Sequence, residues 1–156
     1  MGMAYRVATE ADIAGMARIR ALTWGEEQSW KKSIAAYMDG AADPQKALKS
    51  RIVLVAEEEG SVVGLIAGHL TRRYACDGEL QWIDVVPERR GLGVAAQLLR
   101  RLAEWFAEQN ARKICVDVQQ KNTVARKFYS RHGAQELNPH WMVWKDIRVV
   151  LNSSGR

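Results

Sequence analysis

Two hydrophobic periods alternate along the chain, and each predicts one kind of element. The clearest helical period lies past the middle of the chain, with apolar side chains at Val94, Leu98, Leu102 and Phe106. A repeat every four residues places these side chains on one stripe, which predicts an amphipathic helix over residues 93–110. Weaker versions of the same spacing predict further helices over residues 9–22, 30–40, 44–48 and 122–132.

Short apolar runs bounded by turn residues predict strands, and these are residues 5–7, 51–58, 62–74, 79–86, 113–118, 134–137 and 141–148. Asp77-Gly78 is a favoured hairpin dipeptide, so the runs between 51 and 86 are expected to form an antiparallel meander. The run at 113–118 follows a helical crossover, so we expect it to lie parallel to 79–86.

The order of these elements predicts an α/β (α+β) fold with a mixed, mostly antiparallel sheet of about seven strands flanked by helices. Thr9 and Asp12 have the spacing of a capping box that starts the first helix. Asp43-Pro44 has the pattern of an N-cap followed by proline, and predicts a short helix through Leu48. We expect residues 1–150 to form a single domain and residues 151–156 to form a C-terminal tail.

Composition narrows the class of protein. The chain has 156 residues, of which 47% are hydrophobic and 26% charged, which is typical of a globular domain. No apolar run approaches about 18 residues, so no membrane span or membrane partner is expected. The N-terminus lacks a signal-peptide pattern, which predicts a cytoplasmic protein. Cys76 and Cys115 show no metal spacing, and we expect neither a metal nor a structural disulfide.

The net charge of +5 is concentrated in one segment. Residues 88–131 hold ten basic and four acidic side chains, whereas the rest of the chain holds 13 basic and 14 acidic ones. The segment with the excess also contains a glycine-rich turn, so its charge fits a phosphorylated ligand. No aromatic-interleaved basic stripe or nucleic-acid motif accompanies it, and no nucleic-acid partner is expected.

The glycine-rich turn joins a predicted strand to the start of the main helix. It reads Val85-Val86-Pro87-Glu88-Arg89-Arg90-Gly91-Leu92-Gly93-Val94-Ala95. The first four N–H groups of a helix have no internal partner and the helix dipole is positive there, so such a turn can bind a phosphate group. A P-loop would need a lysine that is absent, and a dinucleotide fingerprint would need a third glycine.

This segment resembles the acyl-CoA-binding turn of the GCN5-related N-acetyltransferases, the GNAT superfamily. Arg90-Gly91-Leu92-Gly93-Val94-Ala95 matches the pattern [Arg/Gln]-x-x-Gly-x-[Gly/Ala] of that family, and Asn122-x-x-Ala125-x-x-Phe128-Tyr129-x-x-x-Gly133 matches the later half. The resemblance covers residues 79–137. It implies a GNAT fold in which strands 79–86 and 113–118 splay apart, and acetyl-CoA as the co-substrate.

The resemblance also implies which residues contact the cofactor. Main-chain N–H groups around the turn would bind the pyrophosphate, the two arginines could add charge, and a strand N–H would polarise the acetyl carbonyl. The implied cofactor-binding residues are Val85, Val86, Arg89, Arg90, Gly91, Leu92, Gly93, Val94, Ala95, Ala96, Asn122 and Tyr129.

Tyr129 is the candidate acid that protonates the leaving thiolate. Asn122 and Tyr129 are seven residues apart, which is close to two helical turns, so they share one helix face with Ala125 between them. A thiol with a pKa of about 8.5 and a phenol near 10 make this proton transfer slightly uphill but feasible. The alternatives are that Tyr129 is a core aromatic residue and that Asn122 is an N-cap.

Glu79 is the candidate base that makes the acceptor amine neutral, either directly or through a water chain. Strand alternation places Glu79, Gln81, Ile83 and Val85 on one face, which is the face of the implied acetyl site, and Asp84 on the other. Several family members place a base at the position that matches Glu79.

The acceptor is expected to be a primary amine on a small molecule or a peptide, attacked directly in a ternary complex. Candidate acceptor-binding residues are Trp24, as an aromatic wall for a cation, and the counter-charges Glu26 and Glu27. The alternative enzyme is a protein N-terminal or lysine acetyltransferase, and the alternative from another class is a non-catalytic CoA-binding module. The resemblance also implies a homodimer, and the sequence identifies neither the acceptor nor the acyl chain length.

Overall fold

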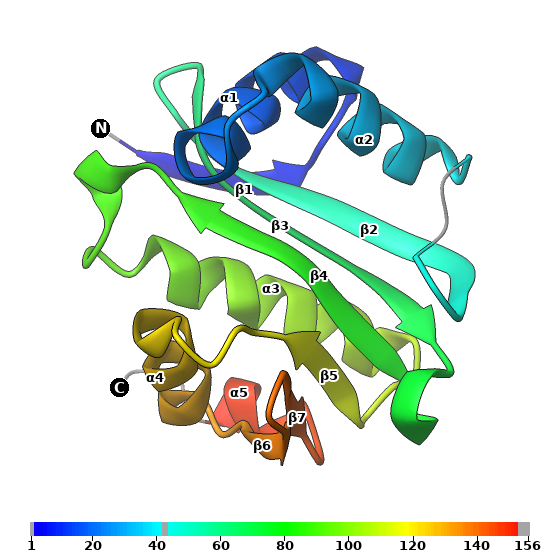
Figure 1. Cartoon of the computed structure of the whole chain (residues 1–156). Helices are drawn as coiled ribbons and strands as arrows, with labels where there is room; N and C mark the ends of the chain where they lie inside the picture. Colours follow the sequence, from blue (N-terminus) through cyan, green and yellow to red (C-terminus); the bar gives the residue numbers. More distant parts are fainter. Residues whose placement is uncertain (1, 42–43, 153–156) are drawn as a thin grey trace.

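The fold is built on one seven-stranded sheet with the strand order β1-β2-β3-β4-β5-β7-β6 (Figure 1). The computed structural model describes residues 2–41 and 44–152. The strands are β1 Met3–Val7, β2 Ala47–Glu58, β3 Ser61–Thr71, β4 Gly78–Val85, β5 Ile114–Asp117, β6 Gln135–Asn138 and β7 Trp141–Trp144. The helices are α1 Ile13–Trp24, α2 Glu27–Asp39, α3 Val94–Glu108, α4 Thr123–Arg131 and α5 Val149–Asn152.

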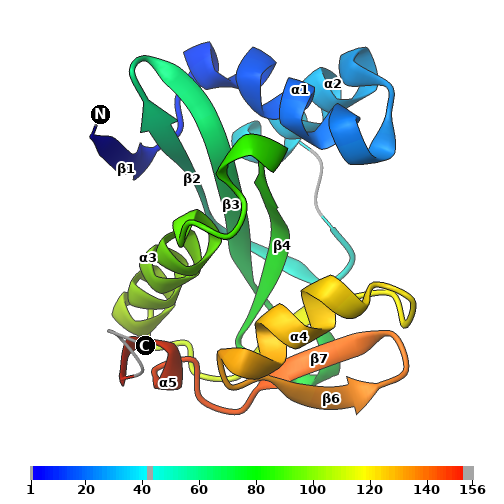
Figure 2. The same cartoon turned by 90° about the vertical axis from the view of Figure 1, so that its left-hand side faces the viewer.

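Helices cover both faces of this sheet, and each face has its own core (Figure 2). On one face, Met16 of α1 and Ile34 of α2 pack with Val55 and Leu65 of the central strands. On the other face, α3, α4 and α5 share a second core in which the apolar stripe of α3 is fully buried. The mixed, mostly antiparallel sheet flanked by helices confirms the predicted fold class, and every pair of neighbouring strands is antiparallel except β4 with β5.

The predicted helix at 44–48 is wrong, because Ala47 already belongs to strand β2 and pairs with Thr71 of β3. Five residues are too few to offset the cost of nucleating a helix, whereas pairing with a long neighbouring strand adds one hydrogen bond after another. Pro44 instead forms a single turn, whose carbonyl accepts a hydrogen bond from the Ala47 N–H. Asp43, the predicted N-cap, lies outside the described residues.

The predicted tight hairpin at Asp77-Gly78 is also wrong. Strand β3 ends at Thr71, and a longer link with a short 3-10 turn at Arg73–Ala75 leads into β4. The Asp77 carboxylate instead accepts hydrogen bonds from the N–H groups of Arg112 and Lys113, just before β5.

The end of the chain differs from the prediction as well. Strand β7 stops at Trp144 rather than continuing to residue 148, and the short helix α5 follows. The carbonyl of Leu151 accepts a hydrogen bond from Arg100 of α3, so this part of the expected tail is docked on the domain. Residues 153–156 lie outside the described residues.

A β-bulge in β4 decides which way the site residues point. Trp82 pairs with Ala67 and Leu80 pairs with Gly68, so two residues of β4 correspond to one step on β3 and Gln81 is the extra residue. Leu80 and Val85 pack in the core under α3, whereas Trp82 packs in the core under α1 and α2. The expected alternation of residues 79, 81, 83 and 85 onto one face is therefore wrong.

Strands β4 and β5 diverge, as the resemblance implies. They pair in parallel at three positions only, Gly78 with Ile114, Glu79 with Cys115 and Leu80 with Val116. Beyond Leu80, β4 continues to Val85 while β5 ends at Asp117 (Figure 2). Among the described strands, none pairs with this edge of the second half of β4.

Candidate functional site

The turn between β4 and α3 is held open by two glycines in the left-handed region. Gly91 has a φ of 78° and Gly93 a φ of 88°, values that strain any residue with a Cβ. Both glycines are exposed, and no atom lies within 4 Å of the place where a Cβ would sit. A ligand can therefore approach the backbone of this turn closely.

The turn presents a row of unused amide groups. The N–H of Arg89 donates to Val86 and that of Arg90 to Pro87, and the next amide bonded to the backbone is Gln97, which donates to Gly93. Between them, the amides of residues 91–96 have no acceptor within the described chain. Six N–H groups at the positive end of α3 form a site suited to an anion such as a pyrophosphate.

The two arginines beside the turn are already engaged. The Nε of Arg89 donates to a carboxylate oxygen of Glu58 at 2.6 Å, so most of its charge is balanced within the protein. The Nε of Arg90 donates to the carbonyl oxygen of Val85 at 3.1 Å, and the rest of its guanidinium is exposed. Arg90 is therefore better placed than Arg89 to add charge at the turn.

Val85 and Val86 differ in the direction of their amides. The Val86 N–H donates to the carbonyl of Val63 at 2.9 Å, so this amide belongs to the β3–β4 ladder and is unsuited to polarise an acetyl group. Successive residues of a strand direct their N–H and C=O groups to opposite edges. The Val85 amide therefore faces the diverging β5 side, as does the Val85 carbonyl that Arg90 contacts.

Tyr129 and Asn122 lie on α4, and the structure separates their roles. Asn122 is the N-cap of the helix, since its Oδ1 accepts a hydrogen bond from the Ala125 N–H at 3.1 Å. Tyr129 is buried beside Trp144, with ring centroids 5.6 Å apart, and its hydroxyl has no hydrogen-bond partner in the described chain. Burial, and then the charge of Asp84 on β4, raise the pKa of the Tyr129 phenol, so the hydroxyl stays protonated, and its proton transfer to a thiolate is more uphill than for an ordinary phenol.

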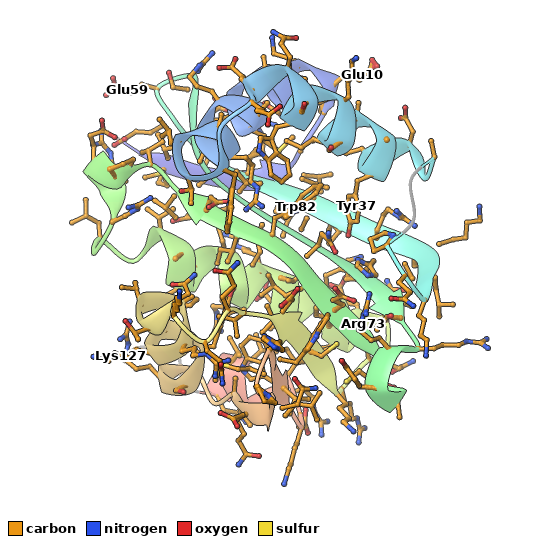
Figure 3. The ribbon with its side chains drawn as sticks, viewed as in Figure 1. Glu10, Tyr37, Glu59, Arg73, Trp82 and Lys127 are labelled. Carbon is orange, nitrogen blue, oxygen red and sulfur yellow. The ribbon has the colours of Figure 1, made fainter. Side chains whose placement is uncertain are left out.

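Glu79 sits at the closed end of the divergence, on the face of the sheet that α1 and α2 cover. Its carboxylate is buried, accepts a hydrogen bond from Arg73 Nε at 3.2 Å and lies 3.5 Å from His69 Nε2. Figure 3 shows Arg73 at the start of β4, and Tyr37 and Trp82 between α2 and the sheet. Glu79 therefore belongs to a buried polar cluster and not to the face of Val85.

Asp84, expected to face away from the site, shares the face of Glu79 and forms an ion pair with Arg20 of α1. The Arg20 guanidinium lies over three indole rings, at 4.4 Å from the Trp30 centroid, 5.6 Å from Trp82 and 5.7 Å from Trp24. Burial raises the pKa of Asp84, and the charge of Arg20 opposes this shift. The predicted aromatic wall at Trp24 thus contacts a cation that the protein itself supplies.

The other predicted acceptor residues lie at the start of α2. Glu26 is exposed with a left-handed φ of 60°, and Glu27 is the first residue of the helix. Neither belongs to the polar clusters around Glu79 and Asp84. Asp117 lies exposed at the end of β5, and desolvation and then the charge of Glu79 raise its pKa, so its carboxyl is within electrostatic reach of Glu79.

Sequence reasoning missed Arg20, His69 and Asp117 as site residues. Arg20 continues the helical spacing of the apolar residues of α1, and His69 interrupts an otherwise apolar strand. A polar side chain at an otherwise apolar position of the sequence indicates such a residue, because a buried polar group needs a hydrogen-bond partner inside the protein.

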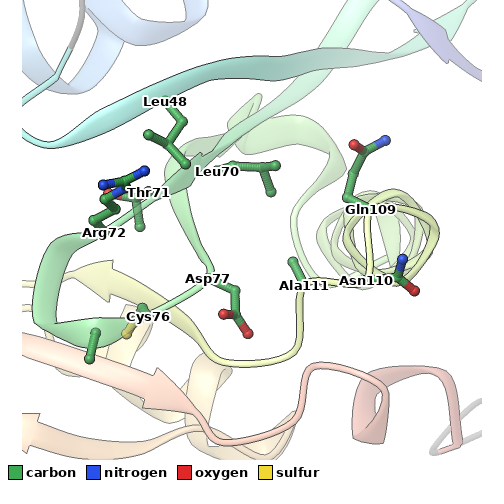
Figure 4. Close-up of a pocket in the computed structure, with 10 residues that line it drawn as sticks. Leu48, Leu70, Thr71, Arg72, Cys76, Asp77, Gln109, Asn110 and Ala111 are labelled. Atoms are coloured by element: carbon green, nitrogen blue, oxygen red, sulfur yellow. The ribbon is translucent and has the colours of Figure 1, made fainter.

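One hollow of the described surface lies elsewhere, near the end of β3 and the C-terminal end of α3 (Figure 4). It has a volume of about 390 Å³ and is lined by Leu70, Arg72, Asp77 and Gln109 among others. Cys76 also lines it, and packs with the buried Cys115 as a free thiol. None of the predicted site residues lines this hollow.

Within residues 2–41 and 44–152, no group of three or more His, Cys, Asp or Glu side chains is arranged to hold a metal ion. None of the helices in that part of the chain has the length and apolar character needed to cross a membrane.

Comparison with known proteins gives matches of two kinds. Residues 16–134 match the family model described as the acetyltransferase (GNAT) family. The curated relatives include an uncharacterized N-acetyltransferase of Mycobacterium tuberculosis strain H37Rv, 31% identical over 101 residues, which are 65% of this chain and 60% of that protein. The chain thus matches about 60% of the length of this relative.

Solved structures resemble the chain over nearly its whole length. The PaiA N-acetyltransferase of Thermoplasma acidophilum in complex with coenzyme A has a TM-score of 0.71 at 15% identity, and covers 93% of this chain and 99% of its own. The aminoglycoside 6′-N-acetyltransferase of Acinetobacter baumannii has a TM-score of 0.74 at 17% identity, covering 88% and 93%. At these identities the likeness shows a shared fold.

Proposed function

The chain belongs to the acetyltransferase (GNAT) family, and on that premise we propose that it transfers an acetyl group from acetyl-CoA to a primary amine by direct attack in a ternary complex. The observation that carries the proposal is the row of six unused amides at residues 91–96, at the start of α3. This row offers a diphosphate hydrogen-bond donors on a helix N-terminus. The coenzyme A complex of a protein with the same fold supports the choice of ligand.

The reaction has four tasks: the acyl donor is held, its carbonyl is polarised, the amine is deprotonated and the leaving thiolate is protonated. Residues on both sides of the β4–β5 divergence fit these tasks. When bound, acetyl-CoA supplies the activated thioester. The amides of residues 91–96 hold its diphosphate, and the Val85 N–H, on the edge of β4 that no strand covers, donates to the acetyl carbonyl oxygen. A donor of this kind contributes about 3 kcal/mol when it is aimed at the developing oxyanion.

The amine must lose a proton before it attacks. An alkyl ammonium group with a pKa of about 10.4 is almost fully protonated at neutral pH, so a base is needed. Glu79, approached through water, takes this proton, and the amine nitrogen then forms its bond to the acetyl carbon while the carbon–sulfur bond breaks. Tyr129 donates its phenolic proton to the departing thiolate, which leaves as CoA.

The acceptor side carries carboxylates at Glu79, Asp84 and Asp117, and this supports an amine acceptor. The acceptor we propose is a primary amine on a small molecule or a peptide. Acetylation of a protein N-terminus or of a lysine side chain is the second candidate. The aminoglycoside acetyltransferase with the same fold supports the proposal of a small-molecule acceptor.

The experiment begins with calorimetric titration of the protein with acetyl-CoA and continues with a panel of small amines, amino-terminal peptides and lysine peptides. Release of CoA is followed with a thiol reagent. We expect acetyl-CoA binding and acetylation of at least one amine, with Leu22→Ala, an exposed position on α1, as a matched control. Binding without any acetylated amine would favour a non-catalytic CoA-binding module, and absence of acetyl-CoA binding would contradict the proposal altogether.

A further inference from the structure

Behind Glu79 lies a buried chain of polar side chains that the reaction described above does not use. His69 of β3 is fully buried and pairs in register with Glu79 of β4. The Tyr37 hydroxyl of α2, 2% exposed as a residue, lies 2.9 Å from His69 Nδ1. The three side chains therefore form a chain that leads from Tyr37 on α2, through the imidazole of His69, to Glu79, the candidate base.

The two ring nitrogens of His69 have different partners. Nδ1 is hydrogen-bonded to Tyr37, whereas Nε2 is buried, lies 3.5 Å from Glu79 Oε1 and has no hydrogen-bond partner within the described residues. A buried polar atom without a partner costs free energy, so such an atom is rarely retained without a role. Here it faces the carboxylate that we assign as the base.

A tyrosine hydroxyl suits both protonation states of an imidazole. In the neutral tautomer that leaves a lone pair on Nε2, Nδ1–H donates to the Tyr37 oxygen, and it continues to donate when the ring is doubly protonated. The hydrogen bond to Tyr37 therefore persists when a proton arrives at Nε2. An imidazole also binds a proton more strongly than a carboxylate does in water, since its ordinary pKa is about two units higher.

We propose that His69 is the second acceptor of the proton that leaves the amine, receiving it at Nε2 from Glu79. The inference rests on the proposed function, because it takes Glu79 as the base. In the first step an N–H bond of the ammonium breaks and an O–H bond forms on Glu79. In the second step that O–H bond breaks and an N–H bond forms at His69 Nε2, which restores the Glu79 carboxylate; His69 acts through Glu79 and is a positioning residue.

The charges around the imidazole make this step depend on Glu79. Arg51 of β2 is the cross-strand neighbour of His69, and its guanidinium lies 4.9 Å from the Tyr37 ring centroid. Arg73, from the turn before β4, holds Glu79 at 3.2 Å, and Cys115 of β5 pairs in register with Glu79. The Glu79 carboxylate is the one that faces His69 Nε2, and desolvation and then the Glu79 charge raise the pKa of Asp117 at the end of β5. An imidazolium at His69 therefore needs the Glu79 carboxylate as its counter-charge.

The first test observes the proton directly and needs no amine acceptor. Protein labelled with 15N-histidine is titrated with acid, and the ring-nitrogen shifts of His69, His132 and His140 are assigned with single His→Gln variants. We expect the His69 ring to become doubly protonated at a lower pH in Glu79→Gln than in the wild type, because the carboxylate that faces Nε2 is then absent. The ring signals of His132 are expected to stay in place. An unchanged His69 titration in Glu79→Gln would overturn the coupling.

The second test measures turnover on the amine that responds best in the acceptor panel. We expect His69→Gln to lower kcat by about 10- to 100-fold at pH 7, with little change in the KM for acetyl-CoA, and to move the acid limb of the pH–rate profile to lower pH. Tyr37→Phe, which keeps the ring and removes the hydroxyl, is expected to shift the limb in the same direction even where His69→Gln folds poorly. Tyr5→Phe on β1 is the matched control.

The outcomes separate the two proposals. A purely structural role of His69 predicts lower stability with an unshifted pH profile, and that result would overturn the inference. If the wild-type protein acetylates no amine, the proposed function fails on its own. The histidine titration still decides whether Glu79 and His69 are coupled.

Discussion

Glu79 and Asp84 lie on the same face of β4, although they are five positions apart in the sequence. In a regular strand an odd separation places two side chains on opposite faces. The extra residue at Gln81 reverses the alternation once, so both carboxylates point to the side covered by α1 and α2. One is held by Arg73 and the other by Arg20, and this places two ion pairs along the acceptor side of the divergence.

Removal of Asp84 is expected to destabilise the fold, because Arg20 would keep a buried charge without its partner. The Arg20 side chain is 10% exposed. We expect Asp84→Ala to lower the free energy of unfolding by about 3–5 kcal/mol, measured by urea denaturation. The double variant Arg20→Met/Asp84→Leu is expected to recover most of this loss. A single variant as stable as the wild type would show that the pair is solvated.

Tyr129→Phe tests the assignment of the acid. The substitution removes the hydroxyl and keeps the ring that packs on Trp144. We expect kcat to fall by about 10- to 1000-fold, while the dissociation constant of acetyl-CoA stays within about twofold. Burial raises the pKa of this phenol, so wild-type activity is expected to show no loss from its ionisation below about pH 10. Unchanged turnover in the variant would remove Tyr129 from the mechanism.

Gly78→Ala tests how closely the sheet approaches α3. An added Cβ at Gly78 would overlap Cε1 of the buried Phe106. We expect a loss of about 1–3 kcal/mol in the free energy of unfolding, because the packed helix leaves no room. Gly78→Ala/Phe106→Leu is expected to regain part of it, and Gly2→Ala, where no atom lies within 4 Å, is the control. Equal stability of the Gly78 and Gly2 variants would contradict the packing described.

The free energy of unfolding is expected to depend on pH in part through the ionisation of Asp12. The hydrogen bond from Arg6, and then those from Thr9, hold the pKa of the Asp12 carboxyl below its ordinary value against its partial burial. A carboxyl with a lowered folded-state pKa stabilises the protein above its unfolded value of about 3.9, and this contribution is lost as pH falls through the folded-state value.

Asp12→Asn is therefore expected to cost about 1 kcal/mol near pH 7, and the difference from wild type should shrink as pH falls below about 4. Thermal unfolding at several pH values measures this. Glu10→Gln, an exposed carboxylate in the same turn, is the control. A difference that stays constant down to pH 2 would contradict the assignment.

The sequence predicted the elements whose pattern is long and local. Helix α3 has an apolar stripe over 15 residues, and its actual start at Val94 follows the glycine turn as expected. The parallel pairing of β4 with β5 followed from the helical crossover between them. The open amides of residues 91–96 followed from the helix start and the glycines, both of which are local properties.

The features that sequence reasoning missed depend on partners far along the chain. The bulge at Gln81 arises from the register of β4 against β3. The amino-acid composition of the strand does not reveal this register, so the predicted face of Glu79 is wrong. Arg20 and Asp84 are 64 residues apart, and their pairing is decided by how α1 packs on the sheet. The segment at 44–48 has local helix signals that pairing with β3 overrides.

Binding of the acetyl-CoA diphosphate by the amides of residues 91–96 is tested by the amide spectrum of 15N-labelled protein during titration with acetyl-CoA. We expect the signals of Gly91, Leu92, Gly93, Val94, Ala95 and Ala96 to shift most. ADP, which carries adenosine and the diphosphate without the acetyl-pantetheine arm, is expected to move the same signals. Binding of acetyl-CoA that leaves these six amides unshifted would contradict this assignment.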